Sequence, residues 1–179
     1  QFGAQRIIAG YTYWLTSLKC ADLDGDNDQD LVVVSETGRL TWFRNNGSGQ
    51  FSVIDAQSIP LTSPRDAGIA DLDGDGDLDL LGYDDISNQV RWFANNGTGE
   101  FGPPQLAVSA ISYAKDINTV DLDGDGDMDV VATTGSNVHS SLNNGDGTFA
   151  AAQVVYTTGS TATAVADVIT RYRRGVRRP

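Results

Sequence analysis

The chain has 179 residues, 40% of them hydrophobic, and a formal net charge of −12. It is long enough for one full domain or a short array of repeats, and no apolar run approaches the roughly 18 to 20 residues of a membrane-spanning helix. Five of the twelve basic residues lie in the last nine positions, so the preceding chain is too acidic to form a nucleic-acid-binding surface.

Three acidic boxes follow one another along the chain. Each places an aspartate at every second position over nine residues, and the boxes are residues 22–30, 71–79 and 121–129. A second motif, an Asn-Asn-Gly turn that leads to phenylalanine, keeps the same spacing at 42–51, 92–101 and, in weaker form, 140–149. A period near 50 residues indicates a repeat architecture. The chain therefore contains three copies of one unit.

Each unit is predicted to form four short strands. In the second copy these are residues 67–70, 78–83, 89–94 and 101–108, separated by the acidic box and by two clusters of turn-forming residues. No segment shows helical periodicity. We therefore predict an all-β fold of propeller-type blades, each with four antiparallel strands, and about three to three and a half blades in this chain.

The acidic boxes indicate bound metal ions. Five carboxylates this close repel one another by roughly 1 kcal/mol per pair even in water, so the folded loop needs a cation. Calcium takes about six to eight oxygen ligands, which side chains at box positions 1, 3, 5 and 9 and the carbonyl at position 7 can supply. All-oxygen ligation favours calcium over zinc or copper. The sharp turn at position 6 falls on Asn27, Gly76 and Gly126, and the residues at position 2 are expected in the core: Leu23, Leu72 and Leu122.

The boxes, their period and the Phe-Gly pairs at 2–3 and 101–102 resemble FG-GAP repeats, also called VCBS repeats, although Phe51-Ser52 and Phe149-Ala150 depart from that pattern. These repeats form the seven-bladed, calcium-binding propellers of integrin alpha subunits and of many secreted lectins, lyases and adhesins. The resemblance covers residues 1 to about 168 and implies about three Ca²⁺ ions, one in each box. The implied ligands are Asp22, Asp24, Asp26, Asp28, Asp30, Asp71, Asp73, Asp75, Asp77, Asp79, Asp121, Asp123, Asp125, Asp127 and Asp129. Asp28, Asp77 and Asp127 would act through their backbone carbonyls.

The number of blades and the C-terminal tail depart from a complete propeller. Propellers usually close with four to eight blades, so we expect the array at 1–168 to be a fragment of a longer protein or one part of an assembly. A fourth box is due near residue 171, but residues 169–179 form an arginine-rich tail instead. We interpret this tail as a frameshifted or disordered remnant of the next repeat, with a genuine basic tail that binds an acidic partner as the alternative.

Catalysis finds little support in the sequence, and we expect that the protein is not an enzyme. His139 is the only histidine, and no nucleophile lies in a recognisable elbow motif. The first function class is an extracellular or cell-surface structural or adhesive module that contacts other protein subunits or copies of itself. The second is a lectin that binds glycans, and the third is a non-catalytic propeller attached to a secreted enzyme. We rank the first class highest.

Several single residues carry further expectations. Trp42, Trp92, Tyr83 and Tyr13 are candidates for stacking on sugars, but the two tryptophans recur at one repeat position, which favours core packing. Cys20 is the only cysteine and is expected to be a small core residue. The sequons at Asn46 and Asn96 have the form of N-glycosylation sites, although asparagine also has a backbone role in such turns.

Overall fold

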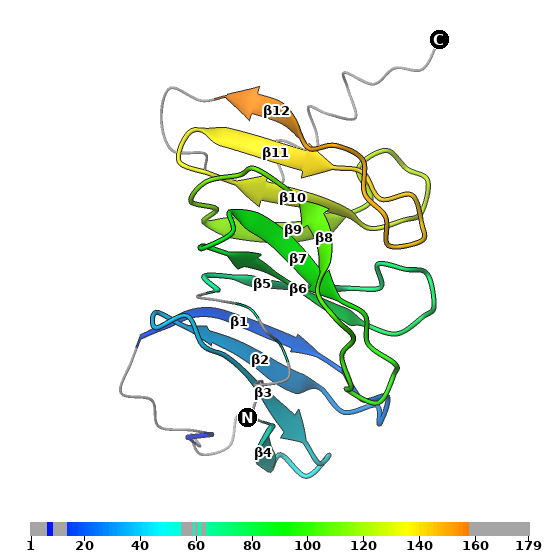
Figure 1. The fold of residues 1–179 in the computed structure, drawn as a ribbon. Helices are drawn as coiled ribbons and strands as arrows, with labels where there is room; N and C mark the ends of the chain where they lie inside the picture. Colours follow the sequence, from blue (N-terminus) through cyan, green and yellow to red (C-terminus); the bar gives the residue numbers. More distant parts are fainter. Residues whose placement is uncertain (1–6, 9–13, 55–58, 60, 62–63, 158–179) are drawn as a thin grey trace, which may run out of the picture.

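The structure, a computed structural model, describes residues 7–8, 14–54, 59, 61 and 64–157. These residues form three antiparallel sheets of four strands each and no helix, so none of them belongs to a helix that is long and apolar enough to cross a membrane. Figure 1 shows the sheets stacked in chain order. The predicted all-β architecture of four-stranded blades is confirmed. Tyr13 and the tail at 169–179 lie outside the described residues.

Within each sheet, neighbouring strands follow the order of the chain. Sheet 1 contains β1 (Leu15–Ala21), β2 (Asp30–Ser35), β3 (Leu40–Asn45) and β4 (Phe51–Ile54). Sheet 2 contains β5 (Ala67–Ala70), β6 (Asp79–Asp84), β7 (Gln89–Phe93) and β8 (Gln105–Val108). Sheet 3 contains β9 (Asp116–Val120), β10 (Asp129–Thr133), β11 (Asn137–Ser141) and β12 (Gln153–Thr157). The first strands of successive sheets, β1, β5 and β9, lie next to one another.

Each acidic box is the loop of a β-hairpin. Ala70 pairs with Asp79 across β5 and β6, and the same register joins the first two strands of the other sheets. The last aspartate of each box is therefore already the first residue of the second strand. All three of these aspartates have exposures of 0%: Asp30, Asp79 and Asp129.

The strand predictions for the second unit hold within one residue for three strands and fail at the fourth. β8 begins at Gln105, whereas Phe101 forms only an isolated bridge to Asn95. Pro103 and Pro104 lie between them, and proline has no N–H to donate to a ladder. The predicted burial of Cys20 is wrong. Cys20 pairs with Leu31, one position along from the pairing of Val32 with Trp42, which packs against sheet 2. Cys20 therefore lies on the opposite face of sheet 1, where it is exposed.

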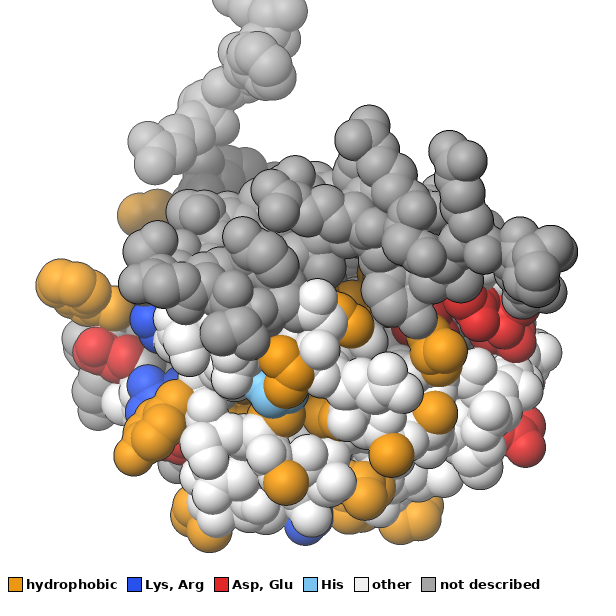
Figure 2. All heavy atoms as spheres, turned by 90° about the horizontal axis from the view of Figure 1, so that it is seen from above, with side chains coloured by type: hydrophobic (Ala, Val, Ile, Leu, Met, Phe, Trp, Pro, Cys, Tyr) orange, Lys and Arg blue, Asp and Glu red, His pale blue; other side chains and the backbone are white. Residues whose placement is uncertain are grey.

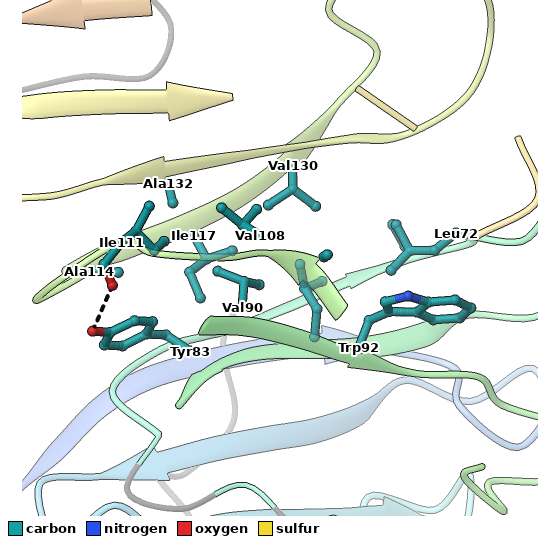
Figure 3. Close-up of a cluster of buried hydrophobic side chains, with 13 residues drawn as sticks. Leu72, Tyr83, Val90, Trp92, Val108, Ile111, Ala114, Ile117, Val130 and Ala132 are labelled. Atoms are coloured by element: carbon teal, nitrogen blue, oxygen red, sulfur yellow. Dashed lines mark hydrogen bonds between the residues drawn. The ribbon is translucent and has the colours of Figure 1, made fainter. Parts of the chain in front are cut away.

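The core lies between the sheets. Trp42 on sheet 1 packs in a cluster with Leu80 and Phe93 on sheet 2. The opposite face of sheet 2 packs against sheet 3 through Tyr83 and Trp92, and Figure 3 shows this second cluster and the hydrogen bond from the Tyr83 hydroxyl to the Ile111 carbonyl. The core packing predicted for the tryptophans is confirmed. The leucines at box position 2 are also buried, as predicted: Leu23, Leu72 and Leu122.

Candidate metal centres

The carboxylates at positions 1, 3 and 9 of each box converge. One oxygen from each of the three side chains lies within 4.8 Å of the others. The three triads are Asp22, Asp24 and Asp30; Asp71, Asp73 and Asp79; and Asp121, Asp123 and Asp129. The predicted ligands at positions 5 and 7 lie in the same loops but outside the triads: Asp26, Asp28, Asp75, Asp77, Asp125 and Asp127. In Figure 2 acidic side chains gather at the right-hand end of the molecule, where Figure 1 places the box loops.

The aspartate at position 1 curls the loop around its own carboxylate. Asp71 accepts hydrogen bonds from the backbone N–H groups of Gly74 at 2.8 Å and Gly76 at 3.1 Å. Gly76 has φ +95°, and Asn27, which takes its place in the first box, has φ +68°. The predicted need for a residue that tolerates a left-handed conformation at position 6 is therefore confirmed.

The aspartate at position 9 ties the start of the loop to the following turn. Asp79 accepts one hydrogen bond from the N–H of Leu72 at 2.8 Å and another from the N–H of Asn95 at 2.9 Å. Burial raises the pKa of Asp79 to about 6, although both hydrogen bonds oppose that rise. Each carboxylate oxygen has a second lone pair, so Asp79 can hold the backbone and still face the loop centre.

In the second box, the aspartate at position 3 has a buried carboxylate oxygen. Oδ1 of Asp73 is buried and accepts no hydrogen bond of good geometry from any described residue, although the nearby N–H of Asp75 favours the charged form. A buried carboxylate oxygen without a partner is unfavourable unless the carboxylate is paired or coordinates a metal ion. Burial also raises the pKa of Asp73. The donor set of the loop, which consists of oxygens only, therefore fits a hard divalent cation such as calcium.

The side chains at positions 5 and 7 support the loop from outside the triad. Asp75 accepts a hydrogen bond from the N–H of Asp77 at 2.9 Å. The Asp77 carboxylate lies against Gly97 in the turn of the same sheet, where an added Cβ would come within 2.6 Å of it. That contact and the φ of +75° explain why this turn requires glycine. Coordination through the Asp77 carbonyl stays a prediction.

The turn of each following sheet also holds the loop of the sheet before it. Asn95 Nδ2 donates hydrogen bonds to the carbonyls of Leu78 in its own sheet, at 3.0 Å, and of Leu23 in the box of sheet 1, at 2.8 Å. Asn143 in sheet 3 bonds the Leu72 carbonyl in the same way at 2.8 Å. We call Asn95 and Asn143 the inter-blade asparagines. Only their turn-forming role was apparent from the sequence, since their second partners lie 72 and 71 residues away.

Three further residues were not apparent as functional candidates. Arg44 forms ion pairs with Asp24 and Asp26 of the first box. The sequence signal for Arg44 appears when the three copies of the second motif are aligned. Arginine then occupies the position that holds Ala94 and Leu142 in the other two copies. Trp14 and Tyr113 are 81% and 71% exposed at the end of the sheets opposite the boxes.

Comparisons with known proteins agree with this architecture. No curated protein matches the chain. Among solved structures, it resembles a lectin from Agrocybe aegerita, described as recognising non-reducing terminal N-acetylglucosamine, with 27% identity and a TM-score of 0.57. The match covers 79% of this chain and 38% of the lectin, so the chain spans well under half of that protein. The model of the FG-GAP-like repeat matches at residues 22–82, 71–132 and 121–168, and the chain therefore belongs to the FG-GAP-like repeat family.

Proposed function

We propose that this chain is a calcium-stabilised, non-catalytic β-propeller module that mediates interactions in the extracellular space or at the cell surface. The observation that carries the proposal is the convergence of three buried or half-buried carboxylates in every box, with a buried oxygen of Asp73 that accepts no hydrogen bond of good geometry. Calcium, when bound, neutralises this charge and links the two strands that the loop joins. The millimolar calcium outside cells suits loops of modest affinity.

Exposed apolar side chains support association with other subunits or with copies of the chain. Leu15 and Leu18 on β1 are 50% and 58% exposed, and Val53 on β4 and Val154 on β12 are 58% and 53% exposed. Apolar groups on the first and last strands of the sheets are suited to further protein contacts, because burying them is favourable.

Asp73→Asn and Asp79→Ala separate metal binding from folding at the second box. Asp73→Asn removes a charge that burial disfavours, so we expect the metal-free protein to be at least as stable as wild type but to lose calcium binding at this box. Asp79→Ala strips the acceptors from Leu72 and Asn95, and leaving two buried N–H groups unpaired costs about 1–3 kcal/mol each. We expect that variant to be destabilised with and without calcium.

Isothermal titration with calcium and urea unfolding in excess chelator measure both properties. The conservative Asp73→Glu variant is the matched control for charge. Undiminished calcium stoichiometry in Asp73→Asn would contradict the assignment of this carboxylate to the metal.

Glycan binding is a second candidate function, favoured by the resemblance to the lectin and by a polar groove. The groove has a volume of about 380 Å³ and lies at the end of sheets 1 and 2 opposite the boxes. Its lining includes Glu36, Arg65 and Lys115, which can donate and accept hydrogen bonds with sugar hydroxyls. The backbone N–H of Glu36 bonds the Trp14 carbonyl at 2.8 Å, so the backbone of Trp14 lies beside a lining residue of the groove. The exposed indole of Trp14 is therefore a candidate flat apolar surface for a sugar ring.

A glycan array tests this second candidate. We expect retention of glycans that end in N-acetylglucosamine and at least about tenfold weaker binding by Trp14→Ala, since a factor of ten corresponds to about 1.4 kcal/mol of lost contact. Ile86→Ala, which removes another exposed apolar side chain, is the control. An array without any retained glycan would leave protein partners as the proposed ligands.

A further inference from the structure

Arg44 distinguishes the first acidic box from the other two. Its guanidinium Nε contacts Oδ2 of Asp24, the position-3 carboxylate of the triad, and its Nη2 lies 3.5 Å from Oδ2 of Asp26. The Asp24 side chain is only 3% exposed, so Arg44 pairs with a carboxylate that is largely shielded from water. The corresponding residues of the other sheets, Ala94 and Leu142, carry no charge.

The Asp24 oxygen that contacts Arg44 belongs to the carboxylate that faces the metal position. Asp22, Asp24 and Asp30 place one oxygen each within 4.8 Å of one another, and neither oxygen of Asp24 accepts a hydrogen bond with good geometry among the described residues. An arginine side chain keeps its charge at all physiological pH values. The charge of Arg44 therefore offsets part of the negative charge of the first box. In the second and third boxes, the corresponding negative charge stays available to a metal ion.

The Arg44 side chain also has space to leave. It is 48% exposed, and it extends from β3 near the turn that follows it. Rotation into solvent would free Asp24 without any change in the backbone. The first box can thus be closed either by the Arg44 guanidinium or by a calcium ion. The two cations cannot both occupy the position next to Asp24.

We propose that Arg44 is a built-in competitor of calcium at the first box, which makes this box the weakest of the three metal sites and the one that responds to changes in calcium concentration. The inference rests on the proposed calcium binding. When calcium is scarce, Arg44 holds Asp24 and Asp26 and keeps the first hairpin closed. When calcium is abundant, it occupies the loop and Arg44 moves into solvent.

Calcium titration of the intact chain by isothermal calorimetry tests this inference. We expect wild type to show a weak phase whose dissociation constant is at least about tenfold above those of the tight phases, because calcium must first displace Arg44 from Asp24 and Asp26. A factor of ten corresponds to about 1.4 kcal/mol. Asp24→Asn should abolish the weak phase, and Asp73→Asn should abolish a tight one. Arg44→Ala, which copies the residue found in sheet 2, should tighten the weak phase by about tenfold.

Thermal unfolding provides a second measurement that does not depend on assigning phases. Between excess chelator and saturating calcium, the midpoint should rise more for Arg44→Ala than for wild type, because the variant lacks the internal cation in chelator and gains a stronger site in calcium. Arg91→Ala is the matched control, since the Arg91 guanidinium bonds Gln89 on its own strand, and its calcium-induced rise should equal that of wild type.

The outcomes separate this inference from the proposed function. Three equal sites in wild type, or an unchanged weak phase in Arg44→Ala, would overturn the role of Arg44 and leave calcium binding intact. Absence of calcium binding in every variant would overturn both.

Discussion

Calcium is expected to raise the midpoint of thermal unfolding of this chain, whereas magnesium should raise it much less. A ligand that binds only the folded form stabilises it by about 2.7 kcal/mol per site at a free concentration 100 times the dissociation constant. For a chain of this size each kcal/mol corresponds to about 2–4 °C, so one filled box should add roughly 5–10 °C. Magnesium requires strict octahedral geometry, which a flexible loop of carboxylates does not provide. It also loses its bound water reluctantly.

The measurement is differential scanning calorimetry in calcium, in magnesium and in excess chelator at constant ionic strength. Ionic strength must be fixed because the formal charge of −12 makes general screening stabilising as well. Equal midpoints in the three buffers would contradict metal binding at the boxes.

Trp92→Ala is expected to cause the largest loss of stability among single substitutions in the core. The indole is 1% exposed between sheets 2 and 3, and the turn of sheet 3 closes over it so tightly that a Cβ on Gly147 would collide with the ring. Removing a buried aromatic side chain of this size costs about 3–5 kcal/mol.

Trp14→Ala provides the matched control, because the same side chain is 81% exposed there and surface substitutions usually change stability by no more than about 0.5 kcal/mol. Urea unfolding in saturating calcium measures both variants. Similar midpoints for the two would mean that Trp92 does not anchor the packing of sheets 2 and 3.

The repeat period and the strand pattern were sufficient to predict the blades, because both depend on local residues. The composition of each box likewise predicted that carboxylates converge there, and those at positions 1, 3 and 9 do. The failure at β8 has a local cause, since the predicted strand included Pro103 and Pro104, which cannot donate ladder hydrogen bonds. Strand alternation alone also could not predict which face of β1 is covered, and for that reason Cys20 was assigned to the core.

Contacts between separate motifs, whether within one sheet or between sheets, were beyond local reasoning. The pairing of Arg44 with Asp24 links two motifs 20 residues apart, and it depends on the register of β2 and β3, which fixes how far the side chain reaches. The burial of Trp92 beneath Gly147 depends on how sheet 3 stacks on sheet 2. Sequence repetition shows that these residues recur, but only the assembled sheets show which neighbour each one contacts.

The inter-blade asparagines determine where the chain can be divided or lengthened. Asn95 holds the box loop of sheet 1 by a hydrogen bond, and Asn143 holds the box loop of sheet 2 in the same way. The modular unit for protein engineering therefore does not coincide with a sheet. A deletion from Asp22 to just before Asp71 removes one box and joins equivalent points of the repeat. Recombination between related arrays should therefore succeed most often with crossovers at the boxes, where each donor segment keeps its loop and receives an equivalent asparagine from the next.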